Sequence, residues 1–529
     1  MQASDHGMPE LQVSKERSDG SLDAVAADTI SKSPGSDCSY EISPASNIWL
    51  HDVGNESSLG SSSSSETGVE RAPSLELQLA SWLAKMELTS PRFLRATPAY
   101  RCGCAFFRER GSGSALASEQ VKTISKFMSH SWQSNPFWKA LGLLLFYNWK
   151  PAVVASCFSA ALVTLLSSLG LLPGVLVTMR SSPQPALLAP WSLSAGLLTF
   201  LLVLILRPPH ELIFFDLLCI NQSDAVEKEN GVLNIGACLK RSEKLLILWD
   251  ASYCQRTWCV FELAAFLKTH EIQDVLVQPL SMSIVFSFSF LYCSLLGYTI
   301  IGGLFQHALY LMAGGLIAFG WLTGTALLNF NQSVEAMQAQ LQNFRIADTM
   351  CHCCSVGHED VLICDRALLM RCVRIWFGSE EEFENYVKES MQNALMHHLG
   401  GSVPYNLVLA ASLPLLWFQM DCAAGFWRRG DFVSGLEFLF SGAYAMFTML
   451  AVFAAIHLCV RCTSRCCPVV RKFFAAAVVT GMTLSNQATL QVCIELLPAS
   501  PMLHRTLWAA IWFFPYAFLC LAGAKRYSK

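Results

Sequence analysis

The stretch "KLLILWDASYCQRTWCVFELAAFL", residues 244–267, decides the fold of this chain. Its apolar run at 244–249 predicts a buried strand, and the run from Thr257 predicts a helix capped by that threonine. The helix holds one carboxylate, Glu262, whose neighbours at three and four positions are Trp258, Cys259, Ala265 and Phe266. A carboxylate on such a face loses hydration unless another group pairs with it. Glu262 is therefore either a first-turn residue tilted toward solvent or a carboxylate held in a cleft to meet a ligand.

The segments around this stretch alternate between strand-like and helix-like patterns. Strands are predicted at "VKTISKFMSHS" (121–131), at the beginning of the buried apolar run "ELIFFDLLCINQ" (211–222), where the strand covers 211–216, and at "DVLVQPL" (274–280). A helical stretch is predicted at 226–240. Continuous apolar strands separated by helices predict a parallel sheet that is covered on both faces. The fold class that follows is α/β.

Polar side chains gather where the predicted strands end. They are Ser129, His130, Ser131 and Trp132 after the first strand, Asp216, Cys219, Asn221 and Gln222 after the second, and Asp250, Ser252 and Tyr253 after the third. The ligand crevice of an open parallel sheet lies at the carboxyl ends of its strands. We therefore expect a ligand site at this edge.

Composition points to a membrane protein, because 53% of the residues are hydrophobic and only 15% are charged, against about 25% charged in soluble chains. A transmembrane helix needs roughly 20 apolar residues. Eight segments qualify, of which the fifth is short: 151–177, 187–206, 283–305, 308–330, 404–420, 434–460, 473–497 and 504–524. They form a first hairpin at 151–206, a second at 283–330, and a four-helix region at 404–524.

Hairpins return the chain to the side it left, so 75–150, 207–282, 331–403 and the C-terminal tail should share one compartment. Cationic residues between the sixth and seventh segments and in the final "KRYSK" place that compartment, with both termini, in the cytosol. The chain shows no secretory signal, and its 21 cysteines are expected as reduced thiols.

Three further expectations follow from composition. Residues 1–74, with "SSLGSSSSSETG", are polar and Ser-rich and are expected to be disordered. A net charge of −3 excludes a strongly basic nucleic-acid binder, so the lipid bilayer is the expected partner and nucleic acid is not. Asn486, Gln487 and Gln491 in the seventh segment fit either a substrate path or hydrogen bonds between helices.

Three pieces of the chain resemble a TIR-like domain in their order and spacing. They are "FMSHSW" (127–132), "FFDLLCINQ" (214–222) and "LNIGACLKRSEKLLILWDASYCQRTWCVFEL" (233–263). The matching positions include Ser242, Ser252, Tyr253, Trp258, Cys259, Glu262 and Leu263, whereas Arg256 stands where plant members of the family usually carry serine. The "D-x-x-C-I-N-Q" piece is also similar to HET-type domains. The resemblance implies a flavodoxin-like TIR-type parallel sheet, here split by the first membrane hairpin into 75–150 and 207–282. Strands 121–131 and 211–216 should then be adjacent and parallel.

The resemblance also implies a function. In NAD-cleaving TIR domains the glutamate at the position of Glu262 is the catalytic carboxylate and contacts the nicotinamide ribose. Its negative charge would stabilise an oxocarbenium-like centre, and at a helix start it should stay ionised near neutral pH. NAD would be the substrate, lined by Ser129, His130, Trp132, Asp216, Asn221 and Trp258. Other TIR domains act only by self-association.

A cysteine- and histidine-rich stretch, "DTMCHCCSVGHEDVLICDR" (348–366), follows the second hairpin. Thiolates and imidazoles at this spacing predict a zinc site made of Cys351, Cys354, His358 and Cys364. The alternative is a group of free or palmitoylated thiols near the membrane. Downstream, "SEEE" (379–382) predicts a capping box before an amphipathic helix that ends near His398. The segment 331–403 is expected to complete the split domain.

The sequence thus predicts a multi-pass membrane protein with a cytosolic TIR-like signalling domain and a bundle of about eight helices. It would act by self-association, by NAD cleavage, or by both. The alternatives are a transporter or channel whose α/β domain is regulatory, and a purely structural scaffold. A transporter should show paired polar or charged groups inside the bundle, and few intramembrane charges are found, notably Glu437 and Glu495.

Overall fold

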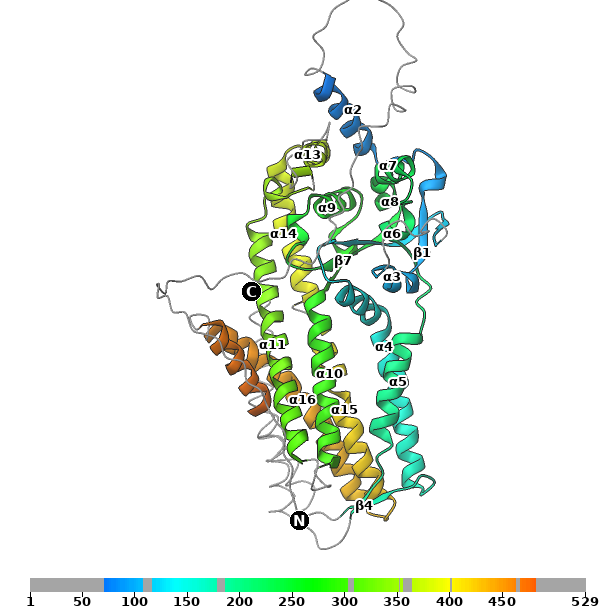
Figure 1. Cartoon of the computed structure of the whole chain (residues 1–529), viewed down its shortest axis with the longest axis vertical. Coiled ribbons are helices and arrows are strands. Elements are labelled where there is room, and N and C mark those ends of the chain that lie inside the picture. Colours follow the sequence, from blue (N-terminus) through cyan, green and yellow to red (C-terminus); the bar gives the residue numbers. More distant parts are fainter. Residues whose placement is uncertain are drawn as a thin grey trace, which may run out of the picture. The chain divides into compact units, whose positions relative to one another are not determined.

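The computed structural model describes residues 71–107, 117–177, 186–302, 309–351, 353–354, 364–399, 402–462 and 467–481 (Figure 1). Most of the predicted N-terminal tail lies outside these residues. Its last four residues, 71–74, instead open the helix α2 (Arg71–Lys85), so the prediction of disorder as far as residue 74 is wrong at that end.

Six strands form one mixed sheet in the order β2-β1-β6-β3-β7-β8. Their bounds are β1 Arg95–Pro98, β2 Glu119–Gln120, β3 Ile124–His130, β6 Leu212–Phe214, β7 Ser242–Trp249 and β8 Val275–Pro279. The four strands β6, β3, β7 and β8 are parallel, and β1 adds an antiparallel edge beside β6. A second, two-stranded sheet pairs β4 (Val175–Val177) with β5 (Ala186–Leu188).

The pairing of β3 with β6 confirms that the intervening hairpin of apolar helices does not separate the two strands. Lys126 is opposite Ile213 and Phe127 is opposite Phe214 in a parallel register. The rings of Phe127 and Phe214 stack with centroids 4.6 Å apart. The chain therefore leaves the sheet after β3, passes through two apolar helices, and returns to the neighbouring position.

Both faces of the sheet are covered, as predicted for continuous apolar strands. Along β7, Leu245, Ile247 and Trp249 belong to one buried cluster, whereas Leu246 and Leu248 belong to another. The first cluster contains side chains of α2, α8 (Ile235–Lys240), α9 (Thr257–Thr269) and α13 (Asp365–Phe377). The second contains side chains of α3 (Tyr100–Ala105) and of the beginning of α4 (Pro136–Ser168). The remaining short helices of this region are α6 Asp216–Cys219 and α7 Ala225–Leu233.

The segment after the second apolar hairpin packs on the same sheet domain. The end of α11 (Leu309–Gln342), α13 and α14 (Glu380–Leu399) all contribute buried residues to the first cluster. Trp376 on α13 donates its indole N–H to the carbonyl oxygen of Ala84 on α2 over 2.8 Å. The serine half of the predicted capping box is present, because the backbone N–H of Glu382 donates to Ser379 Oγ over 3.0 Å.

Among the described residues, four helices are long and apolar enough to cross a membrane. They are α4, α10 (Leu280–Gly302), α15 (Ser402–Trp427) and α16 (Phe432–Cys462). The hairpin partner of α4, helix α5 (Ser192–Leu206), is apolar but only 15 residues long. Helices α10, α11, α15 and α16 lie alongside one another (Figure 1). Of the last two predicted segments, only residues up to 481 are described, and they are helical.

Helix α4 shows that one predicted boundary is wrong. The first membrane segment was expected to start at Pro151, but the helix begins at Pro136 and continues through Pro151. The side chain of Asn135 caps its start by accepting the Phe137 N–H over 2.9 Å. A proline inside an apolar helix removes one backbone hydrogen bond, which neighbouring helices can offset. A single helix therefore covers the sheet with its first turns and joins the helix bundle with the rest.

Polar contacts fix both ends of α5. At its C-terminal end, the Asn148 side chain on α4 donates to the carbonyl oxygens of Leu204 and Arg207 over 3.0 and 2.9 Å. At its N-terminal end, Asp421 on α15 accepts the backbone N–H groups of Ser192 and Leu193 over 2.6 and 3.1 Å. Asp421 is fully buried. Because the first N–H groups of a helix lack partners within the helix, this carboxylate acts as its N-terminal cap.

Replacing Asp421 by alanine is expected to destabilise the bundle by about 1–3 kcal/mol, because two buried N–H groups lose their acceptor. Asp421→Asn keeps one acceptor oxygen and should lose less. Thermal unfolding of the purified protein in detergent, followed by tryptophan fluorescence, measures the difference. Equal unfolding temperatures for wild type and Asp421→Ala would show that the cap contributes nothing.

Candidate functional site

The carboxyl ends of β3 and β7 mark the point where the strand order reverses. Numbered along the chain, the four parallel strands have the spatial order 2-1-3-4, because the chain goes from β3 to β6 on one side and then to β7 on the other. In open α/β sheets, ligands bind in the crevice outside such a reversal. The residues at the carboxyl ends of β3 and β7 are therefore the candidates for a ligand-binding or catalytic site.

Glu262 lies in a buried hydrogen-bond network at this edge. Ser129 at the end of β3 donates its hydroxyl to Glu262 Oε2 over 2.5 Å. The hydroxyl of Tyr253, which follows β7, lies 2.8 Å from Ser129 Oγ and donates to the carbonyl oxygen of Cys259 over 3.3 Å. Ser129 and Tyr253 are fully buried, and Glu262 is only 6% exposed. Three residues from β3, the turn after β7 and α9 thus meet in one place.

The position of Glu262 corrects two expectations. The helix α9 begins at Thr257 with Arg256 as its N-cap, and no acidic residue lies in its first turn, so Glu262 is not a solvent-tilted residue of the helix start. Burial raises the pKa of Glu262 to about 8, although the hydrogen bond from Ser129 acts in the opposite direction. The direction of this shift runs against the expectation that Glu262 stays ionised near neutral pH, because desolvation favours the protonated carboxyl group.

A second set of hydrogen bonds joins the loops after β3 and β7. Ser252 Oγ lies 2.6 Å from Ser131 Oγ and 2.7 Å from Asp250 Oδ1. Ser134 donates its hydroxyl to Asp250 Oδ2 over 2.5 Å. These contacts hold the two loops together at the edge where Glu262 and Ser129 lie.

His130 and Trp132 lie on the other side of β3 from Glu262. The His130 ring is buried against Phe106, Phe215 and Trp132, with ring centroids 5.3–5.6 Å apart. Burial lowers the pKa of His130 well below its usual value, and the ammonium group of the buried Lys139 adds to this effect. His130 is therefore neutral at physiological pH. Its Nε2 atom is buried and has no hydrogen-bond partner among the described residues.

The remaining predicted ligand residues are more scattered. Asp216 is buried at the start of α6, where its Oδ1 accepts the Leu217 N–H over 2.8 Å. Asn221 is partly exposed, and its Oδ1 accepts from Ser223. Trp258 is buried as expected, but its indole N–H donates to Asp365 Oδ2 on α13 over 3.1 Å. The structure thus brings Ser129 and Glu262 together. The side chain of Trp258 instead joins α9 to α13 through its bond to Asp365.

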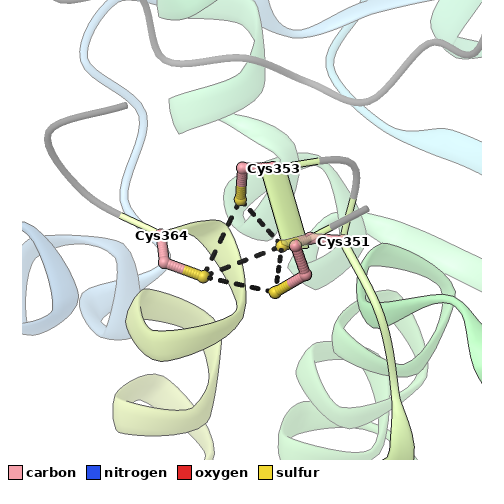
Figure 2. A group of neighbouring side chains, drawn as sticks. Cys351, Cys353 and Cys364 are labelled. Carbon is pink, nitrogen blue, oxygen red and sulfur yellow. Dashed lines mark hydrogen bonds between the residues drawn. The ribbon is translucent and has the colours of Figure 1, made fainter. Parts of the chain in front are cut away.

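Four cysteines form a compact cluster beside this domain (Figure 2). The Sγ atom of Cys364 lies 3.7 Å from each of the Sγ atoms of Cys351, Cys353 and Cys354. Cys351 Sγ is 2.8 Å from Cys353 Sγ and 3.2 Å from Cys354 Sγ. All four sulfur atoms lie within 4.8 Å of one another and could hold a metal ion. The predicted ligand His358 lies outside the described residues, and Cys353, which the prediction omitted, belongs to the cluster.

The environment of the cluster suits metal binding better than lipid attachment. Cys351 and Cys353 are buried, with exposed fractions of 4% and 3%, so they do not present accessible thiols. Burial raises the pKa of Cys354, but hydrogen bonds from the Cys351 and Cys364 thiols outweigh it, and the net pKa lies below its usual value. Burial raises the pKa of Cys351 and of Cys364, and each of these cysteines coordinates a metal only as a thiolate.

Sequence reasoning missed two features of the site. Tyr253 is visible in the sequence as a strand-end residue, but nothing local indicates that its hydroxyl reaches Ser129. Lys139 lies eight or nine residues beyond the first strand, in a stretch that reads as apolar helix, yet it is only 3% exposed and its Nζ lies 5.6 Å from the centroid of the Phe106 ring. Both depend on tertiary packing.

Comparison of the chain with protein-family models, with curated proteins and with solved structures found no match.

Proposed function

We propose that this chain is a multi-pass membrane protein whose sheet domain is a cytosolic TIR-like signalling module. It acts by self-association and by cleaving NAD, with Glu262 as the catalytic carboxylate. Support comes from the TIR-like motifs and from the 2-1-3-4 order of the parallel strands, which is the order of flavodoxin-like sheets. Four apolar helices of sufficient length support attachment to a bilayer.

The observation that carries the proposal is the network of Glu262, Ser129 and Tyr253 at the strand-order reversal. A carboxyl group with 6% exposure is costly to keep in a protein interior. Here it lies at the one edge of the sheet where ligands of this architecture bind. A buried titratable group with a shifted pKa at such an edge is a candidate functional group.

The reaction breaks the bond between the ribose C1′ atom and the nicotinamide nitrogen. The nicotinamide leaves with the electron pair, and positive charge develops on the ribose until water adds to C1′ and loses a proton. An ionised Glu262 would stabilise this charge, and its effect is large because water is excluded from its surroundings. Ser129 keeps the Glu262 carboxyl group oriented through the bond to Oε2.

The four-cysteine cluster belongs to the same proposal as a structural zinc site. Zinc prefers four tetrahedral ligands, and thiolates bind it at about 2.3 Å, which places neighbouring sulfur atoms about 3.8 Å apart. The three sulfur separations of Cys364, 3.7 Å each, already match that spacing. The sulfur atom of Cys351 would have to move outward by about 0.5–1 Å to complete the tetrahedron.

The direct test is to incubate the purified full-length protein, in detergent or lipid nanodiscs, with NAD and to measure nicotinamide release by chromatography. We expect release that grows linearly with protein concentration and is absent from heat-denatured protein. No release at any pH between 6 and 9 would remove the enzymatic half of the proposal. Chemical cross-linking in the same nanodiscs tests self-association independently, and a purely monomeric protein would remove that half.

A further inference from the structure

We propose that the four-cysteine cluster, when it holds a metal ion, acts as a clamp on the first turn of α9 and thereby positions Glu262. The cluster is made of Cys351, Cys353, Cys354 and Cys364. This inference rests on the proposed metal binding, but it does not rest on NAD cleavage. Two hydrogen-bonded contacts, one at each end of the cysteine segment, connect the cluster to α9.

The first contact is made by Met350, the residue directly before Cys351. Its backbone N–H donates to the carbonyl oxygen of Gln255 over 2.8 Å, and its carbonyl oxygen accepts the N–H of Thr257 over 3.3 Å. Met350 and Arg256 thus form an isolated parallel bridge. The N–H of Thr257 is one of the helix-start donors that have no partner within the helix. Met350 therefore supplies a partner that α9 cannot supply itself.

The second contact is made by Asp365, the residue directly after Cys364. Asp365 is 3% exposed and accepts the indole N–H of Trp258, in the first turn of α9. Cys364 is the N-cap of α13, so its sulfur position and the start of α13 are coupled. Both ends of the cysteine segment therefore bind the first turn of α9. Met350 does so through its backbone and Asp365 through its buried side chain.

This turn is directly linked to the Glu262 network. Glu262 lies four residues after Trp258, which is one helical turn further along α9. Tyr253, whose hydroxyl contacts Ser129, belongs to the short 3₁₀ helix Tyr253–Gln255, and Met350 bonds to the last residue of that helix. A displacement of Met350 would therefore shift both the short helix that carries Tyr253 and the first turn of α9, which precedes Glu262.

A metal ion explains how residues 351–354 and residue 364 are held to each other. The contacts of the Cys364 sulfur atom with the other three cysteines are thiol–thiol contacts, and thiols are weak donors and acceptors. Four thiolate bonds to one ion would replace them with a rigid junction, and the free energy of metal binding then contributes to the folding of the segments it joins.

The test uses the full-length protein in detergent and measures metal content and hydrogen–deuterium exchange. Wild type is expected to contain about one zinc per chain, and replacement by Co²⁺ should produce the intense thiolate-to-cobalt absorption of a tetrahedral thiolate site. Removal of the metal with a strong chelator should accelerate amide exchange in residues 253–262 by at least about tenfold. Exchange in β8, the edge strand on the far side of β7 from β3, should not change.

Cys353→Ser is the variant that isolates the site, and Cys104→Ser, at an exposed thiol on α3, is its matched control. Cys353→Ser should lose at least nine-tenths of the metal and show the fast exchange of the chelated wild type. If this variant fails to fold, amide exchange of the chelated wild type still tests whether the metal ion stabilises residues 253–262. Protein without bound metal, or metal loss with unchanged exchange in 253–262, would overturn the proposal. Neither readout requires NAD, so inactivity toward NAD leaves the result interpretable.

Discussion

Replacing Glu262 by glutamine is expected to abolish nicotinamide release and, at the same time, to make the folded protein more stable above pH 7. Glutamine keeps the shape of the side chain and an oxygen that can accept the Ser129 hydroxyl. It cannot carry the negative charge that the reaction requires, so the expected loss of activity is at least about a thousandfold, as for other removed electrostatic groups. An inactive variant with increased stability cannot be explained by misfolding.

The stability gain follows from the pKa of Glu262. Its folded-state pKa of about 8 lies above the ordinary value of 4.5 that applies to the unfolded chain, so between these values the folded state binds a proton that the unfolded state has released. The contribution of Glu262 to stability is therefore fully present below pH 4.5 and declines as the pH rises through about 8. Each unit of pKa difference corresponds to about 1.4 kcal/mol. At pH 8.5 the glutamine variant should exceed wild type by a few kcal/mol, and at pH 4.5 the difference should vanish.

The pH dependence of NAD turnover in wild type should also reflect the ionisation of Glu262. If the ionised carboxylate is the active form, nicotinamide release should increase with pH up to about 8 and then level off. Thermal unfolding and NAD turnover at pH 5, 7 and 8.5 measure both effects. Glu243→Gln, at an exposed carboxylate at the start of β7, is the matched control and should change neither. Equal turnover in wild type and Glu262→Gln would show that the carboxylate is not catalytic.

The strands β6, β7 and β8 could be predicted from the sequence because each contains a short apolar run, as expected for a strand buried on both faces. In β3, "ISKFMSH", only three of the seven residues are apolar, and its pattern indicates a strand that ends in small polar residues. The order of the chain then leaves few ways to arrange the four strands. The strands β1, "RATP", and β2, "EQ", were not predicted. They carry little apolar surface. The edge of β6 offers backbone partners to β1, and β1 in turn offers them to β2.

The depth of the site could not be predicted from local sequence. The motif places Glu262 on α9, but its burial depends on tertiary packing: Ser129, 133 residues earlier, contacts its carboxyl group. The first turn of α9 is in turn held by Asp365 and Met350, which follow about 90–110 residues later. In the same way, spacing alone could not separate Cys353 from His358 as a fourth ligand, because both are close enough to Cys351 along the chain. The extension of α4 through Pro151 was also hidden, since a proline usually signals a boundary.

Replacing Trp258 by alanine is expected to cost about 3–5 kcal/mol of folding free energy, the range for large aromatic deletions in a core. Trp258 is 6% exposed, its ring meets Phe261 edge to face with centroids 5.6 Å apart, and its N–H bonds to Asp365. The alanine variant loses the packed volume and one buried hydrogen bond together.

Trp258→Phe separates these two losses, because it keeps most of the ring contact and removes only the N–H donor to Asp365. It should cost about 1–2 kcal/mol, and it should accelerate amide exchange in the first turn of α9 without affecting β8. Thermal unfolding in detergent measures the stability of both variants, with Phe137→Ala, at a ring that is 54% exposed, as the control for removing an aromatic group. If Trp258→Ala unfolds at the same temperature as Phe137→Ala, then Trp258 is not the contact that holds α9 against α13. The junction would instead depend on the Met350 bridge and the cysteine cluster alone.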